Sequence, residues 1–419
     1  MTSSDGNPLP SPMPTPGAGS VVYPPPAQDV PCATCGQGGY GASPALTAFG
    51  PGDVYGRRFG SRLYGSAEFL MWWVRDDRAP RLAVTTPTVP TMADQTTIAQ
   101  TPIFGGEVNG LFPTNGYGGR FGLGLWFTDA QIRGLETSFF FLGTRVTDAT
   151  FASDAAGAPN ISRPFLTPLG ANNLEIVTAA GMNSGSVRFQ TESSLYGGDI
   201  NYRRQLLGQC GCGDRLDLLA GFRYMHLAEG LTITENTTAI PGSPLPQVSG
   251  SVFDRFATSN NFYGPQLGLS GELHRGPWSL EGAAKVALGV TSHYVSIQGS
   301  QSGVTINGVP SADPRTGGLL ALSTNIGNYS QSSFSVVPEA TLNLGYQLTP
   351  HIKLFVGYTI LVWTNVMRPG GQIDPVVDPA RIPNYLPVGT APTSMHPQPT
   401  FARSDFWAQG INFGLQLKW

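Results

Sequence analysis

The stretch that decides the fold is residues 407–419, WAQGINFGLQLKW. From Ile411 onward every second position carries an apolar side chain, namely Ile411, Phe413, Leu415, Leu417 and Trp419. Successive residues of a β-strand point to opposite faces, so this alternation predicts a strand with one apolar and one polar face. At about 3.3 Å per residue and about 40° of tilt, the stretch spans roughly 30 Å, the hydrocarbon thickness of a bilayer. We therefore expect a membrane-spanning strand, with Trp407 and Trp419 in opposite interfacial girdles.

The same two-residue period recurs along the chain. Ten segments predict strands of membrane-spanning length: 62–74, 119–128, 133–142, 187–202, 215–227, 262–273, 278–291, 334–348, 352–364 and 406–419. Pro338 lies within one of them and predicts a β-bulge, because proline cannot donate to a strand ladder. The fold class is therefore all-β. We expect an antiparallel up-and-down transmembrane β-barrel of about 10 strands, with 12 as the alternative if the long connections add strands.

One of the ten segments changes parity along its length. Val187 and Phe189 stand on the opposite parity from Tyr196, which predicts a bulge near residues 193–194 or 197–198.

The connections alternate between two length classes. Short ones are 129–132, 203–214, 274–277 and 349–351, and long ones are 75–118, 143–186, 228–261, 292–333 and 365–405. Short periplasmic turns opposite long extracellular loops are typical of bacterial outer-membrane barrels. A soluble β-sandwich or propeller is the alternative, but neither would place Leu, Phe and Trp on its outer face.

The composition fits a Gram-negative-type cell envelope protein. Charged residues are only 12% of the chain and mean hydropathy is near zero, as expected where lipid-facing and lumen-facing residues alternate. The net charge of −3 argues against a nucleic-acid partner. Residues 1–60 are Pro/Gly-rich and predict a disordered periplasmic linker, with the barrel at 61–419. Residues 1–20 carry no signal peptide, so we expect the true start to lie upstream.

Two sequence motifs suggest a cofactor or a metal. The glycines of residues 36–41 match a dinucleotide fingerprint, but this motif needs a strand before it and a helix after it, and it stands in the linker. The four cysteines are Cys32, Cys35, Cys210 and Cys212. Four thiolates suit zinc, yet disulfides are the simpler expectation in the oxidising periplasm. We predict no metal and no cofactor.

One arrangement suggests catalysis. Asp76 and Asp77 follow the first predicted strand, and His226 ends another at the same side of the membrane. Ten-stranded outer-membrane proteases, the omptins, place paired Asp and an Asp/His couple at such a rim, and paired carboxylates with a histidine can activate water. Here the second Asp beside the histidine is absent. We therefore expect no enzyme, and keep an omptin-like protease as the minor alternative.

Polar residues of the opposite parity are expected to face the lumen. They are Glu136, Asp199, Arg215, Asp217, Arg223, Glu272, Glu281, Lys285, Glu339 and Lys353. Aromatic residues expected at the membrane interfaces are Trp73, Trp278, Phe334, Tyr346, Trp407 and Trp419. The lumen charges either fill the barrel as internal ion pairs or line a pore, and ten strands lie nearer the packed limit.

Several motifs, in this order along the chain, resemble the putative beta-barrel porin-7 family of planctomycete-type outer-membrane proteins. They are residues 67–73 (AEFLMWW) with 78–82 (RAPRL), 118–126 (GGRFGLGLW), 221–224 (GFRY) with Glu229, 261–264 (NFYG) and 285–289 (KVALG). The resemblance covers about residues 62–419 and implies an outer-membrane barrel without catalytic residues to carry over. The C-terminal aromatic strand is also similar to the pattern that barrel-assembly machinery recognises.

From these features we expect porin-like permeability for small hydrophilic solutes, and transport across the outer membrane. The alternative is a non-conducting structural or adhesive surface barrel, since the long polar connections are where such functions concentrate. The expected partners are outer-membrane lipid and the assembly machinery.

Overall fold

The computed structural model describes residues 62–91, 95–106, 110–209, 212–243, 248–310, 315–383 and 391–419. The predicted linker at 1–60, Cys32, Cys35, Cys210 and the side chain of Cys212 lie outside the described residues. The linker and disulfide predictions therefore stay predictions. No helix of the described residues is long and apolar enough to cross a membrane.

The main sheet is a closed barrel of ten antiparallel strands. They are β1 (Leu63–Val74), β4 (Asn115–Trp126), β5 (Arg133–Ala152), β8 (Asn183–Gln209), β9 (Cys212–Ala239), β10 (Val248–Arg275), β11 (Trp278–Ile306), β14 (Gly327–Thr349), β15 (Ile352–Val366) and β16 (Ser404–Lys418). Each predicted segment is one of these strands, and the first strand closes the ring by pairing with the last. Short strands β12 (Val309–Pro310) and β13 (Arg315–Thr316) pair with β11.

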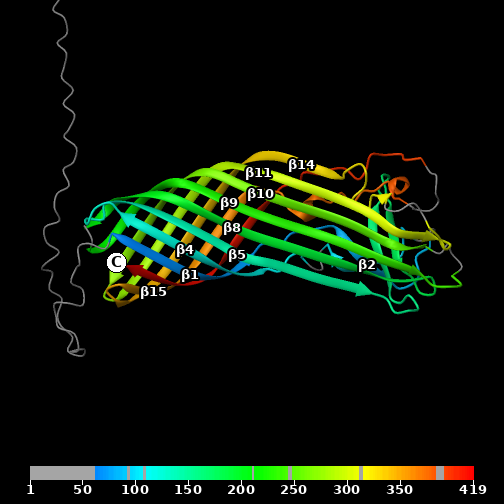
Figure 1. Cartoon of the computed structure of the whole chain (residues 1–419), viewed down its shortest axis with the longest axis horizontal. Helices are drawn as coiled ribbons and strands as arrows, with labels where there is room; N and C mark the ends of the chain where they lie inside the picture. Colours follow the sequence, from blue (N-terminus) through cyan, green and yellow to red (C-terminus); the bar gives the residue numbers. More distant parts are fainter. Residues whose placement is uncertain are drawn as a thin grey trace, which may run out of the picture. The chain divides into compact units, whose positions relative to one another are not determined.

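The barrel wall is much taller on one side than on the other, which the sequence did not predict. Strands β8 to β11 contain 27 to 29 residues, whereas β1, β4, β15 and β16 contain 12 to 15. At about 3.3 Å per residue and about 40° tilt the long strands span roughly 70 Å, more than twice the hydrocarbon thickness. In Figure 1 they continue far beyond β1 and β15, on the side away from the C-terminus.

The predicted long loops at 228–261 and 292–333 are therefore mostly wrong. Residues 228–239, 248–261, 292–306 and 327–333 are strand, and what remains as connection is much shorter. Inward side chains of these extensions, such as Leu231 and Ile233, are fully buried. Their alternation continues past the membrane, but the outward residues become polar, so the segments look like loops in the sequence.

A second, four-stranded sheet fills the space beside the tall part of the wall. Its order is β3 (Thr101–Gly105), β2 (Arg81–Thr86), β6 (Asn160–Leu166) and β7 (Asn172–Thr178). Two short 3-10 turns, η1 (Pro369–Gln372) and η2 (Pro379–Arg381), accompany it. Apolar residues of the small sheet, including Leu82 and Phe104, form one core cluster with Phe189, Phe256 and other residues of the wall. The outer part of the barrel is thus a packed domain.

The bulge predicted near residues 193–194 is present at this level, but the neighbouring strand β5 carries it, opposite Ser193 and Leu195. Strand β8 keeps one register with β9 from Asn183 to Gln205, so Val187 and Phe189 simply point inward, into the core above the membrane. The register shift lies on the neighbouring strand β5, between Leu142 and Arg145. Apolar side chains change face where a strand leaves the lipid, because the hydrocarbon is outside below that level and the protein core is inside above it.

Pro338 also lies in an unbroken register with Val286 of β11. On its other side, the ladder between β14 and β15 begins only at Glu339. Proline therefore stands at the end of a ladder, where a missing N–H donor is tolerated without a bulge.

An apolar belt surrounds the short part of the wall. Leu342 and Phe334 on β14 are 56% and 62% exposed, although both are large and apolar. Of the predicted interface aromatics, Trp73, Trp278, Phe334, Tyr346 and Trp419 are exposed and Trp407 is half-buried. Such a belt is expected to face lipid rather than water.

Candidate functional site in the barrel interior

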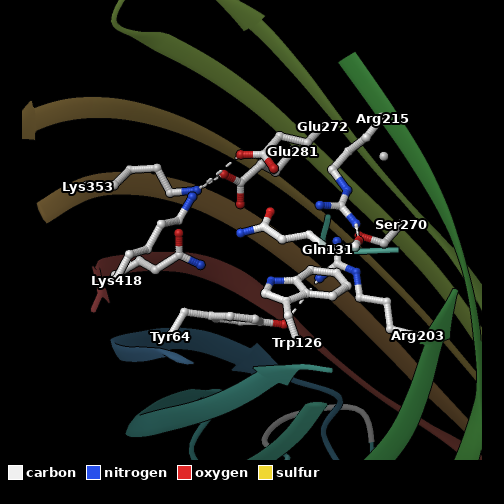
Figure 2. A pocket seen from close by; sticks show the side chains of 12 residues that line it. Tyr64, Trp126, Gln131, Arg203, Arg215, Ser270, Glu272, Glu281, Lys353 and Lys418 are labelled. Carbon is white, nitrogen blue, oxygen red and sulfur yellow. Dashed lines mark hydrogen bonds and ion pairs between the residues drawn. The ribbon is translucent and has the colours of Figure 1, made fainter. Parts of the chain in front are cut away.

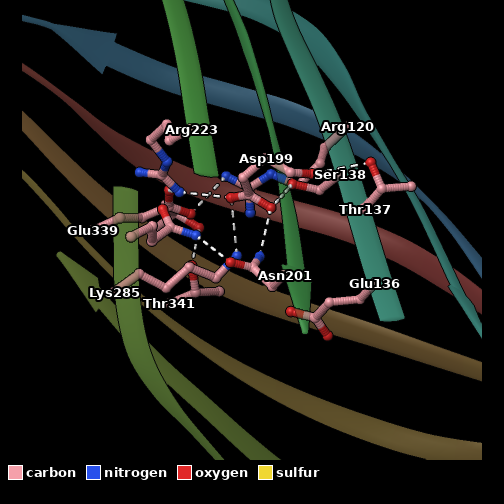
Figure 3. Close-up of polar contacts among 12 residues, drawn as sticks. Arg120, Glu136, Thr137, Ser138, Asp199, Asn201, Arg223, Lys285, Glu339 and Thr341 are labelled. Atoms are coloured by element: carbon pink, nitrogen blue, oxygen red, sulfur yellow. Dashed lines mark hydrogen bonds and ion pairs between the residues drawn. The ribbon is translucent and has the colours of Figure 1, made fainter. Parts of the chain in front are cut away.

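A layer of charged side chains crosses the middle of the lumen (Figure 3). Arg223 donates to Asp199 at 2.8 Å and also to Glu339, and Lys285 lies 3.2 Å from the same Asp199 carboxylate. Arg120 adds contacts of 3.5 Å to Glu339 and 3.8 Å to Glu68. Three cations thus face three carboxylates, and most are nearly fully buried. A balanced, mutually hydrogen-bonded set of this kind cross-links the strands that carry it.

A second charged layer lies nearer the short turns. Arg203 contacts Glu136 at 3.1 Å and Asp217 at 2.6 Å, and Arg215 donates to Asp217. Lys353 pairs with Glu281 and lies 3.5 Å from Glu272.

These side chains line a cavity of about 110 Å³ at the end of the barrel that carries the short turns. Figure 2 shows the Trp126 ring beside the arginines, whose guanidinium carbons lie 4.5 and 5.2 Å from its centroid. This vestibule has room for a few water molecules and is polar on most sides.

An apolar layer lies across the lumen on the other side of the middle charges. It is one contiguous cluster with side chains from every barrel strand except β4, and its largest members are Trp72, Phe140, Phe262, Trp363 and Phe406. Each of these five is at most 4% exposed. The indole N–H of Trp72 donates to Asn412 at 2.8 Å, and that of Trp363 donates to Thr291 at 3.0 Å. All side chains of this layer belong to the barrel strands, and no loop within the described residues contributes to it.

The ten lumen residues predicted from parity all lie on the inner face of the wall and all take part in ion pairs. Sequence reasoning did not name Glu68, Arg120 and Arg203, although their parity is opposite to that of the lipid-facing neighbours Phe69, Phe121 and Tyr202. The two-residue alternation could therefore have identified these three residues as facing the lumen.

A third group of polar side chains lies above the apolar layer. No pattern in the sequence predicted that these residues would meet. Arg368 follows β15 and donates to both oxygens of Glu229, at 2.6 and 2.7 Å. The N–H of Gly370 donates to Asp77, and burial raises the pKa of Asp77 to about 6. Arg368 comes from a connection without periodicity, so its inward position could not be inferred.

The omptin-like arrangement is not assembled. Asp77 is buried beside Arg368, on the inner side of the wall. His226 has the outward parity of Phe222 and packs on Tyr196, with 4.7 Å between ring centroids. Its Nδ1 lies 2.9 Å from Oδ1 of Asn261. The histidine and the carboxylate therefore face opposite sides of the wall.

A closed ten-stranded barrel with an apolar outer belt and a charged interior defines an outer-membrane β-barrel protein. The sequence matches the family described as Putative beta barrel porin-7 over residues 64–419. The chain belongs to this family, as its motifs predicted. No curated protein matches it.

Solved structures share the barrel architecture only distantly. The outer membrane protease OmpT from Escherichia coli is 11% identical, covers 85% of this chain and 97% of its own, and has a TM-score of 0.41. A Pseudomonas aeruginosa FadL homologue is 8% identical, with 85% and 89% covered and a TM-score of 0.21. The TodX deltaS2S3 mutant monoaromatic hydrocarbon channel is 7% identical, with 85% and 90% covered and a TM-score of 0.20. These values are too low to indicate a shared activity.

Proposed function

We propose that the protein is a closed outer-membrane barrel that carries a folded extracellular unit, and that it acts as a structural or adhesive surface barrel. The observation that supports this function best is the apolar layer around Trp72 and Trp363. Side chains of the wall are as buried at this level as those of a protein core, and an apolar layer of this kind opposes the passage of hydrophilic solutes.

The charged layers support the same function. An aqueous pore keeps its lining charges solvated, whereas here Arg223 and Glu339 are at most 8% exposed and bonded to each other. Ten strands also lie near the number at which a barrel is filled by its own side chains. The interior charges therefore serve to hold the wall together.

The tall part of the wall is the part of the protein that would carry out the structural or adhesive function. Strands β8 to β11 and the small sheet build a rigid extracellular unit, and binding residues are commonly found on loops carried by such a scaffold. No catalytic step belongs to this proposal. Its partners are outer-membrane lipid along the apolar belt and, during assembly, the barrel-assembly machinery at β16.

Porin-like permeability for small hydrophilic solutes is the second candidate. The family description favours it, and the vestibule at the short-turn end provides a polar entrance. For the barrel to conduct, the Trp72 and Trp363 side chains would both have to break their hydrogen bonds and move out of the lumen.

Conductance of the purified full chain in planar bilayers separates the two functions. We expect no stable channels from the natural protein. The double variant Trp72→Ala with Trp363→Ala removes the two largest side chains of the layer and should conduct small ions. Trp73→Ala removes the same side chain from the lipid face and should stay closed. Steady channels from the natural protein would overturn the structural function in favour of the porin.

A further inference from the structure

A basic cavity lies at the upper rim of the short wall, where β1 ends and β16 begins. Its volume is about 120 Å³, and four arginines line it, namely Arg75, Arg78, Arg368 and Arg403. Asp76 and Asp77 are the only carboxylates in its lining.

Three of these arginines have no carboxylate partner among the described residues. Arg75 donates to the backbone carbonyl of Asp405, and Arg403 donates to the amide oxygen of Gln331 at 3.1 Å. The side chain of Arg78 is exposed and has no hydrogen bond or ion pair within the described part of the chain. Arg368, in contrast, is held by Glu229. Three guanidinium groups are thus available for an anion from outside the protein.

The two carboxylates of the cavity are already bound to backbone donors. Oδ1 of Asp76 accepts from the N–H groups of Asp77 and Phe112, and Asp77 accepts from Gly370. Backbone donors therefore hold one oxygen of Asp76 and one of Asp77, and among the described residues neither carboxylate forms an ion pair with Arg75, Arg78 or Arg403. A guanidinium group offers paired N–H donors that match phosphate oxygens.

The height of the cavity indicates where such an anion comes from. Trp73, exposed on the lipid face, stands two residues before Arg75, and the N–H of Arg75 donates to the carbonyl of Trp407 at 2.8 Å. Tryptophans mark the membrane interface, and two residues of tilted strand add only about 5 Å beyond it. Arg75 is thus at the level of lipid headgroups.

We propose that this cavity binds the phosphate group of an outer-leaflet lipid headgroup, held by Arg75, Arg78 and Arg403. The acyl chains of the same lipid would lie along the apolar belt below, beside Trp73. The site is independent of whether the lumen conducts.

Native mass spectrometry of the full chain in detergent tests the proposal by counting bound lipids and giving their affinity. The probes are short-chain phosphatidic acid, diacylglycerol with the same chains, and inorganic phosphate alone. We expect one tightly held phosphatidic acid per chain and at least about tenfold weaker binding of the other two probes. The double variant Arg78→Gln with Arg403→Gln should lose this affinity by a similar factor.

The matched control is Arg188→Gln with Arg255→Gln. It changes the net charge equally, but these arginines pair with Asp148 and Glu192 on the tall wall. It should bind phosphatidic acid as the natural protein does. If both double variants lost the same affinity for phosphatidic acid, the effect would come from net charge alone, and the proposed site would be wrong. Equal affinity for phosphatidic acid and inorganic phosphate would assign the site to free phosphate, and equal affinity for diacylglycerol would exclude a phosphate site.

Discussion

Arg163 and Asp254 form a 2.7 Å ion pair between residues 91 positions apart, and both side chains are fully buried. The arginine belongs to the small sheet and the aspartate to strand β10 of the wall. The Asp254 carboxylate also accepts from the backbone N–H groups of Leu319, Leu320 and Ala321. The Asp254 carboxylate therefore links strand β10 both to the small sheet and to the apolar segment 319–321.

Asp254→Asn should loosen the extracellular unit while leaving the membrane barrel folded. Removing one partner of a buried ion pair costs about 3–5 kcal/mol, because the other charge stays buried without compensation. Hydrogen exchange at residues 315–322 and in β6 should rise strongly. Asp148→Asn, which breaks the exposed pair with Arg188, should change exchange little. Unchanged protection in Asp254→Asn would show that the pair is not a fastening point.

The stability of the same unit should fall as the pH rises. Burial, reinforced by the negative charge of Glu235, raises the pKa of Glu175 on β7 to about 8. The folded state then binds a proton that the unfolded state has lost above its ordinary pKa, so stability decreases between about pH 4.5 and pH 8. Protease susceptibility of the extracellular unit should increase across this window. Glu175→Gln should flatten the dependence, and an equal slope in this variant would assign the titration to another group.

The two faces of β14 should tolerate charge differently. Leu342 is 56% exposed on the lipid face, whereas its neighbour Asn343 points inward and pairs in register with Glu281. Leu342→Arg should cost about 2–4 kcal/mol if it lies near the bilayer midplane. Asn343→Arg should be milder, since carboxylates are nearby. Urea unfolding in lipid vesicles measures both, and the reverse ranking would contradict the assignment of the faces.

The middle charged layer should contribute more than any surface pair. Arg223→Met leaves Asp199 and Glu339 without their shared donor, and we expect a loss of about 3–5 kcal/mol in unfolding free energy. Arg188→Met breaks an ion pair whose arginine is 47% exposed, and should cost less than about 1 kcal/mol. Similar losses in both variants would mean that the lumen charges are solvated, as in an open pore.

The sequence predicted the membrane part of the fold well because lipid imposes a strict rule on it. Outward residues such as Phe413 and Leu415 must be apolar, so the alternation is visible without homologues. Parity also placed the charges of the lumen on the inner face. Their pairing could not be predicted, because Asp199 and Lys285 meet across the lumen from strands that are not neighbours.

The extracellular unit was not predicted, because no lipid surrounds it and its outer face does not have to be apolar. Above the membrane the outer face meets water, so residues such as Thr234 alternate with Ile233 and Glu235 in a pattern that resembles a loop. The buried positions include charges, such as Glu235 and Asp254, that a core is not expected to contain. Arg163, which pairs with both, comes from the short strand β6 inside a long connection, and only the tertiary structure brings it to these carboxylates.

The seam between β1 and β16 constrains how the protein is made. The Trp72–Asn412 hydrogen bond joins residues 340 positions apart, and the strands on either side of it cannot pair until the whole chain has been synthesised. Until that moment both strands keep an unpaired edge that invites aggregation, and contacts of such long range form slowly. Ring closure therefore has to wait for the complete chain, because β1 has no partner along this edge before β16 has been made.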